Sequence, residues 1–222
     1  LGLHKNTAHN LIRTLFHRKY LAQLPDSRYL LGEAVHALAS PHDPWEALCR
    51  QAAPVLQALA HDTGDCAFLG VLAQGRLRCI ALVEGTGAIR VSVNQQWEEQ
   101  LHCTAAGKAL LAWEPEALEA FLARPDALVR RTPETIVDPA ALRRNIAAAR
   151  KAGYTTVCNE SVEDVASLGV PIFRQDSRFV GALAQSFPAY RLEGGRLDVK
   201  ARVKRLQQDA AAIARQMCGQ SE

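Results

Sequence analysis

Apolar side chains recur every three or four residues at both ends of the chain, a spacing that predicts a helix at each end. Near the start, residues 5–17 place a group of apolar side chains on one helical face. Residues 45–61 carry a second stripe, in which Pro54 is expected to introduce a kink. Residues 195–218 carry a third stripe, which can cover a sheet or pair with another subunit. The first stripe contains Ala8, Leu11, Ile12 and Leu15, and the last contains Val199, Val203, Leu206, Ala210, Ile213 and Met217.

The middle of the chain is dominated by strand-like runs. Residues 66–72 and 77–83 are apolar runs joined by a turn signal, and residues 89–93 alternate with period two. Short helices are expected at 115–123 and from Pro139 to about Gly153, with Asp138 as the N-cap of the second. Further strands are expected at 154–159, 165–173 and 179–186. This order of elements predicts an α+β fold with helices packed on an antiparallel sheet.

A hairpin pattern follows the first helix. Residues 20–24 and 28–31 are apolar runs around Pro25-Asp26-Ser27, whose residue types favour a tight turn. A helix followed by a hairpin is the second half of a winged helix-turn-helix. The helix that braces the reading helix in that motif would precede Leu1, so we expect these 222 residues alone to bind DNA weakly.

Charge singles out the same segment. Residues 1–32 contain five Lys or Arg and one acid, a net charge of +4, whereas the whole chain is +3 and the other 190 residues therefore sum to −1. A local positive excess on a small helical unit is the electrostatic mark of a phosphate-binding face. The polar face of the first helix carries Asn6, His9, Asn10, Arg13 and His17. Asn and Arg are side chains that bind base edges, while Lys and Arg bind phosphates.

Composition narrows the class of protein. Apolar residues make up 48% of the chain, enough for a real core. No stretch approaches the roughly 18 consecutive apolar residues that a membrane span needs. The six cysteines are scattered without a CxxC pair, so we expect a reduced, cytoplasmic protein without cofactor or metal. Residues 32–39 predict a linking helix, and the Pro-rich stretch 40–44 predicts a domain boundary.

Residues 101–111, LHCTAAGKALL, are the main candidate for chemistry. Small residues before an apolar run suit a helix N-terminus, whose free N–H groups and dipole attract a carboxylate. Close packing on a sheet is the commoner reason for such residues. A thiol-dependent enzyme using Cys103 and His102 is an alternative, although no recognised catalytic motif accompanies the pair. Zinc bound by His102, Cys103, Cys158 and Cys66 is a further possibility that no ligand spacing supports.

Four sequence motifs together resemble the IclR family of bacterial transcriptional regulators, over nearly the full chain. GLHKNTAHNLIRTL resembles the turn and recognition helix, and YLAQLPDSRYLLG resembles the wing. LHCTAAGKALLA resembles the helix that begins the effector site, and GYTTVCNESVEDVASLGVPIF with VGALAQS resembles the strands that close it. The resemblance implies an incomplete winged helix-turn-helix at 1–32, a linker helix and boundary at 33–44, and a GAF-like effector-binding domain at 45–222. It also implies operator DNA, a small carboxylate or aromatic acid as effector, and a homodimer or tetramer.

The resemblance also implies site residues. Those expected to bind the effector are Ala105, Ala106, Val157, Val165, Ser167, Ala184 and Ser186. Those expected to face DNA are Lys5, Asn6, Thr7, His9, Asn10 and Arg13. Departures from the family pattern occur at Val157, often acidic in relatives, at Asp164, often glycine, and at Gln185 and Phe187. With Val157 and Val165 apolar, we expect a less polar ligand body whose carboxylate lies near the helix start and Ser186. A sensory module that never contacts DNA is the remaining alternative.

Overall fold

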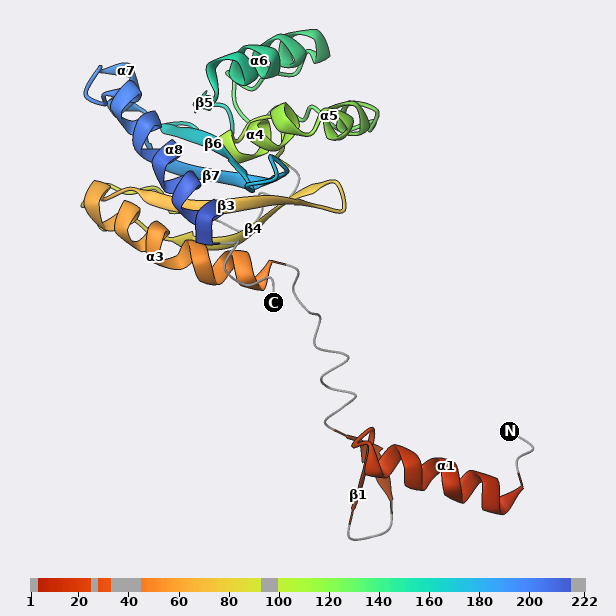
Figure 1. The fold of residues 1–222 in the computed structure, drawn as a ribbon. Coiled ribbons are helices and arrows are strands. Elements are labelled where there is room, and N and C mark those ends of the chain that lie inside the picture. The colour runs from red at the N-terminus through yellow and green to blue at the C-terminus, as the bar shows by residue number, and fades with distance from the viewer. Residues whose placement is uncertain (1–3, 25–27, 33–44, 93–99, 217–222) are drawn as a thin grey trace. The chain divides into compact units, whose positions relative to one another are not determined.

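The computed structural model describes residues 4–24, 28–32, 45–92 and 100–216, and the chain divides into two compact units (Figure 1). The N-terminal unit comprises Leu1–Glu46 and the C-terminal unit comprises Ala47–Glu222. The predicted linking helix and the Pro-rich boundary lie outside the described residues, apart from Gly32. No helix in the described ranges is long and apolar enough to cross a membrane.

The N-terminal unit is a helix followed by a two-stranded hairpin, as the apolar pattern predicted. Helix α1 spans Lys5–His17, and strands β1 (Leu21–Gln23) and β2 (Tyr29–Leu31) pair antiparallel. Lys19, with a φ of 61°, turns the chain out of the helix. A Cβ on Gly32 would lie 2.2 Å from the Lys19 carbonyl oxygen, so only glycine fits where β2 ends beside this turn.

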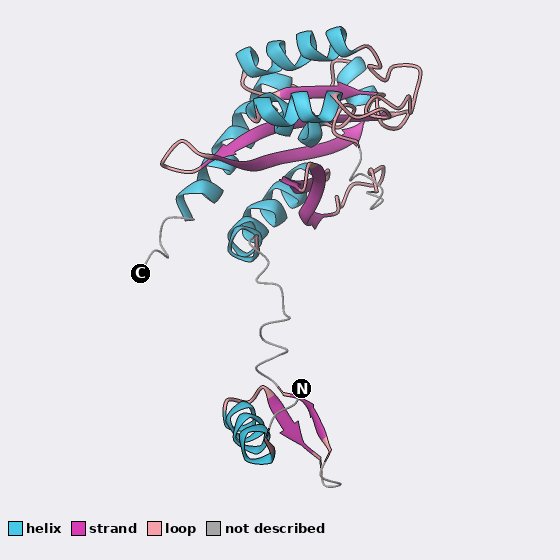
Figure 2. Cartoon of the chain, turned by 90° about the vertical axis from the view of Figure 1, so that its right-hand side faces the viewer, coloured by secondary structure: helices cyan, strands magenta, loops and turns pink. Residues whose placement is uncertain are grey.

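The C-terminal unit is built on a five-stranded antiparallel sheet with the order β4-β3-β7-β6-β5 (Figures 1 and 2). Its strands are β3 (Cys66–Ala73), β4 (Arg76–Val83), β5 (Thr155–Cys158), β6 (Val165–Phe173) and β7 (Phe179–Pro188). Five of the six strands expected after residue 60 are therefore confirmed. The strand expected at residues 89–93 is wrong for residues 89–92, which pair with no strand in the described structure. There the chain has left the sheet, because Gly87 N–H binds the Gly64 carbonyl oxygen at 3.0 Å after β4 ends.

Helices cover both faces of this sheet (Figure 2). α3 (Glu46–Thr63) and α8 (Val199–Gln216) lie on one face, and the four-residue α7 (Tyr190–Glu193) follows β7. α4 (Ala105–Trp113) packs on the other face, with α5 (Pro115–Leu122) and α6 (Pro139–Ala152) beside it. The predicted cap of α6 is confirmed: Asp138 Oδ2 accepts from Ala141 N–H at 2.6 Å, and Gly153 ends the helix at φ 80°. The antiparallel sheet between helices confirms the α+β prediction.

Small residues let α4 lie close to the sheet. The Cβ of an alanine at Gly169 would lie 2.8 Å from the Ala105 carbonyl oxygen, and that of an alanine at Gly70 would lie 3.2 Å from the Ala106 Cβ. The Thr155 hydroxyl donates to the same Ala105 oxygen at 2.7 Å. These contacts fix the start of α4 against β3, β5 and β6.

On the opposite face of the sheet, a polar network centres on the buried Asp65. Its carboxylate pairs with Arg191 of α7 and, at 3.0 Å, with Arg202 of α8. Arg202 also donates to Gln185 Oε1 at 2.6 Å, and Gln185 Nε2 donates to the Thr63 hydroxyl at 2.6 Å. Gln185, a departure from the family pattern, therefore ties β7 to α3 and α8.

Candidate functional site

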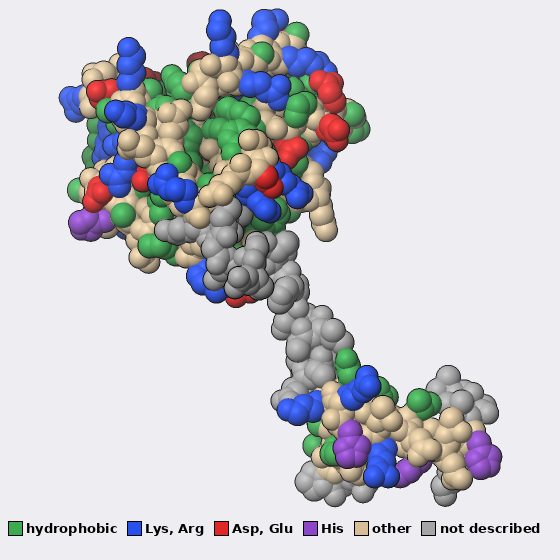
Figure 3. All heavy atoms as spheres, viewed as in Figure 1, with side chains coloured by type: hydrophobic (Ala, Val, Ile, Leu, Met, Phe, Trp, Pro, Cys, Tyr) green, Lys and Arg blue, Asp and Glu red, His purple; other side chains and the backbone are tan. Residues whose placement is uncertain are grey.

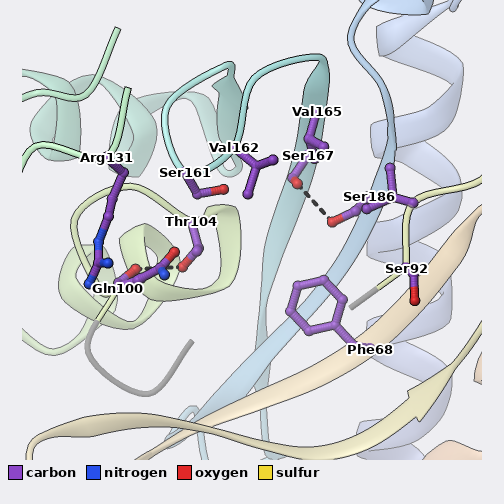
Figure 4. A pocket seen from close by; sticks show the side chains of 11 residues that line it. Phe68, Ser92, Gln100, Thr104, Arg131, Ser161, Val162, Val165, Ser167 and Ser186 are labelled. Carbon is purple, nitrogen blue, oxygen red and sulfur yellow. Dashed lines mark hydrogen bonds between the residues drawn. The ribbon is translucent and has the colours of Figure 1, made fainter. Parts of the chain in front are cut away.

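A cavity of about 220 Å³ lies between the start of α4 and the sheet (Figure 4). Strand β3 contributes Phe68, and strands β6 and β7 contribute the polar and apolar side chains of one wall. Loops and the start of α4 form the remaining walls. The residues that line the cavity are Phe68, Val91, Ser92, Gln100, Thr104, Arg131, Ser161, Val162, Val165, Ser167 and Ser186. The cavity is slightly smaller than the roughly 300–1,000 Å³ that holds drug-sized ligands, which suits a small molecule.

Two serines form a polar group on the sheet wall. Ser167 of β6 and Ser186 of β7 are directly opposite in the strand register, and their hydroxyl oxygens are 2.8 Å apart. One hydroxyl donates to the other, so the pair retains one hydroxyl hydrogen and several lone pairs for a ligand. Both side chains are almost fully buried. The register thus creates a hydrogen-bonding site at one end of the cavity.

Arg131 and Thr104 lie at the other end (Figure 4). The Thr104 hydroxyl caps α4 by accepting from Gly107 N–H at 3.1 Å, and it donates to the Gln100 carbonyl oxygen at 2.8 Å. Within the described part of the chain, no carboxylate forms an ion pair with the Arg131 guanidinium, whose residue is fixed by Arg131 N–H donating to the Thr135 hydroxyl at 3.0 Å. The result is a positive charge at this end, where an anionic group can bind.

The sequence-predicted effector residues divide into two groups. Val165, Ser167 and Ser186 line the cavity. The other four are buried beneath it or beside it and do not line it: Ala105, Ala106, Val157 and Ala184. Ala105 and Ala106 contact the sheet, so the packing explanation for the small residues of this helix holds for them. Val157 lies opposite Ser167 in the register, and Ala184 lies opposite Phe68.

Sequence reasoning missed the residues that give the cavity its charge and half of its walls. Arg131, Ser161 and Val162 come from loops, which carry no periodic signal. Thr104 stood in the quoted helix-start motif, and its position before the helix is the usual signal of an N-cap. Phe68 belongs to a strand that is buried on both faces, so no alternation of apolar and polar residues showed which face it occupies.

The geometry does not support a Cys–His nucleophile. The His102 ring Nε2 is 2.9 Å from the Val129 carbonyl oxygen, while the Cys103 thiol points to Gln100 Oε1 at 3.9 Å. Burial raises the pKa of Cys103 to about 12, which leaves almost no thiolate near neutral pH. Burial also lowers the pKa of His102, and the positive charges of Lys108 and Arg131 lower it further. Across the described ranges, no group of three His, Cys, Asp or Glu residues is placed to hold a metal ion.

The N-terminal unit presents the polar face of α1 to solvent. Asn6, Thr7, His9, Asn10 and Arg13 are all exposed, and Lys5 begins the helix. Residues 4–24 and 28–32 contain no Asp or Glu, and Figure 3 shows Lys, Arg and His side chains spread over this unit. The unit therefore has exposed donors and a positive charge on one short helix and its hairpin.

Comparison with known proteins identifies the class. Residues 46–215 match the family model described as bacterial transcriptional regulator IclR, C-terminal. The glycerol operon regulatory protein of Streptomyces griseus is 30% identical over 218 residues, which cover 98% of this chain and 85% of that protein. The HTH-type transcriptional regulator XynR of Escherichia coli strain K12 is 30% identical over 202 residues, covering 89% of this chain and 79% of that protein.

Solved structures of similar proteins point to the same family. A putative IclR regulator from Silicibacter sp. TM1040 superposes with a TM-score of 0.70 at 30% identity, covering 97% of this chain and 85% of that one. An IclR homologue from Microbacterium hydrocarbonoxydans, complexed with 4-hydroxybenzoate, gives a TM-score of 0.68 at 25% identity, covering 97% and 87%. The fold and these matches define a bacterial transcriptional regulator. The chain belongs to the IclR family, which confirms the resemblance drawn from its motifs.

Proposed function

We propose that the cavity binds a small organic acid that carries a second polar group, and that this effector changes the affinity of the regulator for its operator. The observation that carries the proposal is Arg131, which lines the cavity at the end away from the Ser167–Ser186 pair (Figure 4). Phe68 and Val165 supply apolar surface to the lining. A ligand with a carboxylate at one end, an apolar body and a hydroxyl or carbonyl at the other end fits this arrangement.

The charge distribution supports this orientation of the effector. A carboxylate needs donors, and the guanidinium offers several in a planar fork. Ser167 and Ser186 already share one hydrogen bond, so the pair is better suited to a single neutral hydroxyl. The sequence-based hypothesis placed the carboxylate at the helix start and Ser186, and the proposal moves it to Arg131. The bound 4-hydroxybenzoate of the Microbacterium homologue has a carboxylate and a hydroxyl at opposite ends of a ring.

A thermal-shift series tests the effector class. We expect 4-hydroxybenzoate or a similarly small hydroxy acid to raise the melting temperature. A ligand that binds only the folded state raises the free energy of unfolding by RT ln(1 + [L]/Kd). At 100 times Kd the gain is about 2.7 kcal/mol. The matched control is the neutral amide, 4-hydroxybenzamide, which should give a much smaller shift. Equal shifts with acid and amide would contradict anion recognition, and no shift with any small acid would contradict the effector class.

We further propose that α1 is the reading helix of a winged helix-turn-helix and that β1 and β2 form its wing. The exposed side chains Asn6, Thr7, His9, Asn10 and Arg13, together with Lys5, are proposed to contact DNA. Asn and Arg offer bidentate hydrogen bonds to adenine and guanine edges. The proposed assembly is a homodimer or tetramer, since a symmetric regulator matches operators with related half-sites. Because its target is the bacterial chromosome, the regulator is proposed to act in the cytoplasm.

Replacing Arg13 with alanine should weaken binding to the operator by about 5- to 150-fold, because a bidentate base contact contributes roughly 1–3 kcal/mol. Fluorescence anisotropy with the operator, at several salt concentrations, measures both affinity and salt dependence. The matched control is Arg144→Ala, which removes the same charge from an exposed position on α6 of the C-terminal unit. Arg144→Ala should bind as the parent does. Equal affinity of Arg13→Ala and the parent would remove Arg13 from the proposed DNA contacts, and no operator binding by the parent would favour a sensory module that does not contact DNA.

A further inference from the structure

The helix that begins at the cavity, α4, carries a lysine whose side chain is completely buried in the protein. Lys108 stands in the second turn of α4, and its side chain has no solvent exposure. Its ammonium lies 2.6 Å from Glu160 Oε1, and the Glu160 side chain is only 11% exposed. Among the described residues, the other carboxylate oxygen of Glu160 is buried without a hydrogen-bond partner. The carboxylate is therefore held through one oxygen by one partner.

Glu160 belongs to a six-residue loop, Asn159–Asp164, that joins β5 to β6 and forms one wall of the cavity. The two residues that follow Glu160, Ser161 and Val162, line the cavity (Figure 4). Asn159 and Asp164 both have positive φ, 58° and 61°, so the chain turns sharply at each end of the loop. The pairing continues up to the loop, because Asn159 N–H donates to the Val165 carbonyl oxygen at 2.8 Å.

Both ends of this loop are held by hydrogen bonds to their backbone carbonyl oxygens, the Asn159 side chain donates to Glu193, and the Glu160 side chain adds an ion pair. Thr135 donates its hydroxyl to the Glu160 carbonyl oxygen at 2.7 Å, and Ala189 N–H donates to the Asp164 carbonyl oxygen at 2.8 Å. The Glu160 carboxylate reaches across to α4 and meets Lys108. Within the described residues Ser161 and Val162 form no hydrogen bonds of their own, so the position of these lining side chains depends on the residue just before them.

The energetics of this buried ion pair indicate that it does more than occupy volume in the core. Burial lowers the pKa of Lys108 and raises the pKa of Glu160, so each charge is costly unless the other is close. Apolar side chains of similar volume often stabilise a fold as well as a buried ion pair does. An ion pair adds a single preferred geometry, because its energy depends steeply on the distance and direction between the two groups.

We infer that the Lys108–Glu160 pair is a positioning device, which sets the distance between the start of α4 and the loop wall and thereby shapes the effector cavity. The inference rests on the proposed function for its effect on effector affinity. Lys108 and Glu160 do not line the cavity themselves. They act through Ser161 and Val162 on one side and through Thr104, one turn before Lys108, on the other.

The test separates positioning from stability with a double variant, Lys108→Met/Glu160→Met. Because both charges are removed together, its stability should stay close to that of the parent. Hydrogen exchange followed by mass spectrometry should nevertheless show faster exchange for amides 161–163, by about fivefold or more, which corresponds to a small local loss of stability. Calorimetry with 4-hydroxybenzoate as the probe should show binding about tenfold weaker than in the parent.

The matched control is Arg202→Met, which disrupts the buried polar network on the opposite face of the sheet but keeps the Asp65–Arg191 pair that holds α7. It should lower the melting temperature while leaving exchange at 161–163 and probe affinity unchanged. Parent-like exchange at 161–163 in a folded double variant would overturn the inference, as would equal changes in the double variant and in Arg202→Met. Exchange is measured without ligand. A parent that binds no acid would therefore contradict the proposed function alone, and exchange would still decide the positioning role.

Discussion

Replacing Arg131 with alanine is expected to weaken effector binding by about 10- to 100-fold, the largest loss of any single residue that lines the cavity. Hydrogen bonds to a charged group contribute roughly 1.5–3 kcal/mol, and the exposure of Arg131 favours the lower part of that range. Calorimetry measures the change in affinity, with the acid that gives the largest thermal shift as the ligand. Arg131→Lys should recover part of the affinity, because an ammonium keeps the charge but loses the bidentate fork.

Two further variants make this result specific. Arg130→Ala removes the same charge from the neighbouring residue, whose guanidinium binds the Pro133 carbonyl oxygen and does not line the cavity, so its affinity should match the parent. Ser186→Ala should cost only about 2- to 10-fold, the range expected of a neutral hydrogen bond. A larger loss in Ser186→Ala than in Arg131→Ala would return the carboxylate to Ser186, one of the two positions that the sequence-based hypothesis gave it.

The Arg131→Ala variant also tests how the effector regulates operator binding. An effector changes operator affinity only when it binds one arrangement of the regulator better than another. Because this coupling is reciprocal, an Arg131→Ala regulator should need a proportionally higher effector concentration to reach the same change in operator binding. The operator affinity of the effector-free variant should equal that of the parent, since Arg131 lies in the C-terminal unit and α1 in the N-terminal unit.

Local chemistry explains which elements the sequence predicted well. Asp138, Pro139 and Gly153 mark the two ends of α6 because N-caps, first-turn prolines and left-handed C-caps depend on neighbouring residues only. The hairpin of the N-terminal unit followed from its turn residues and apolar runs in the same way. The strand expected at 89–93 failed at residues 89–92 because alternation alone does not supply a pairing partner: Val91 lines the cavity, whereas Ile89, on the same side of the pattern, is 62% exposed.

The site was harder to predict, because its charge comes from parts of the chain far apart in sequence. Ser167 and Ser186 were found through a family motif, and the strand register then brought them together. Arg131 lies in a loop between α5 and α6, and nothing in its neighbours indicates that it lines a cavity bounded by β3, β6 and β7. Lys108 looked like an ordinary polar residue in a helix, and only the three-dimensional fold shows that it is buried against Glu160.

Gly107→Ala is expected to destabilise the C-terminal unit by about 3 kcal/mol, although alanine is the better helix former by roughly 1 kcal/mol. An added Cβ would lie 2.5 Å from the Leu101 Cα, 2.6 Å from the Leu101 carbonyl oxygen and 2.7 Å from the Thr104 hydroxyl oxygen. Two of these atoms belong to the backbone and the third is the cap of α4, so none can give way cheaply. The strain therefore adds to a partial loss of the cap, which alone is worth about 1 kcal/mol.

Urea unfolding followed by circular dichroism measures the effect of Gly107→Ala, with Gly195→Ala as the matched control. Gly195 has open space around its Cβ position, and only its φ of 61° opposes a side chain, so the control should lose no more than about 1–2 kcal/mol. A Gly107→Ala protein as stable as the parent would mean that the turn from Leu101 to Thr104 can move away from α4. Since Thr104 lines the cavity, such freedom would also undermine the rigid effector site proposed from its geometry, because that site depends on the position of the same residue.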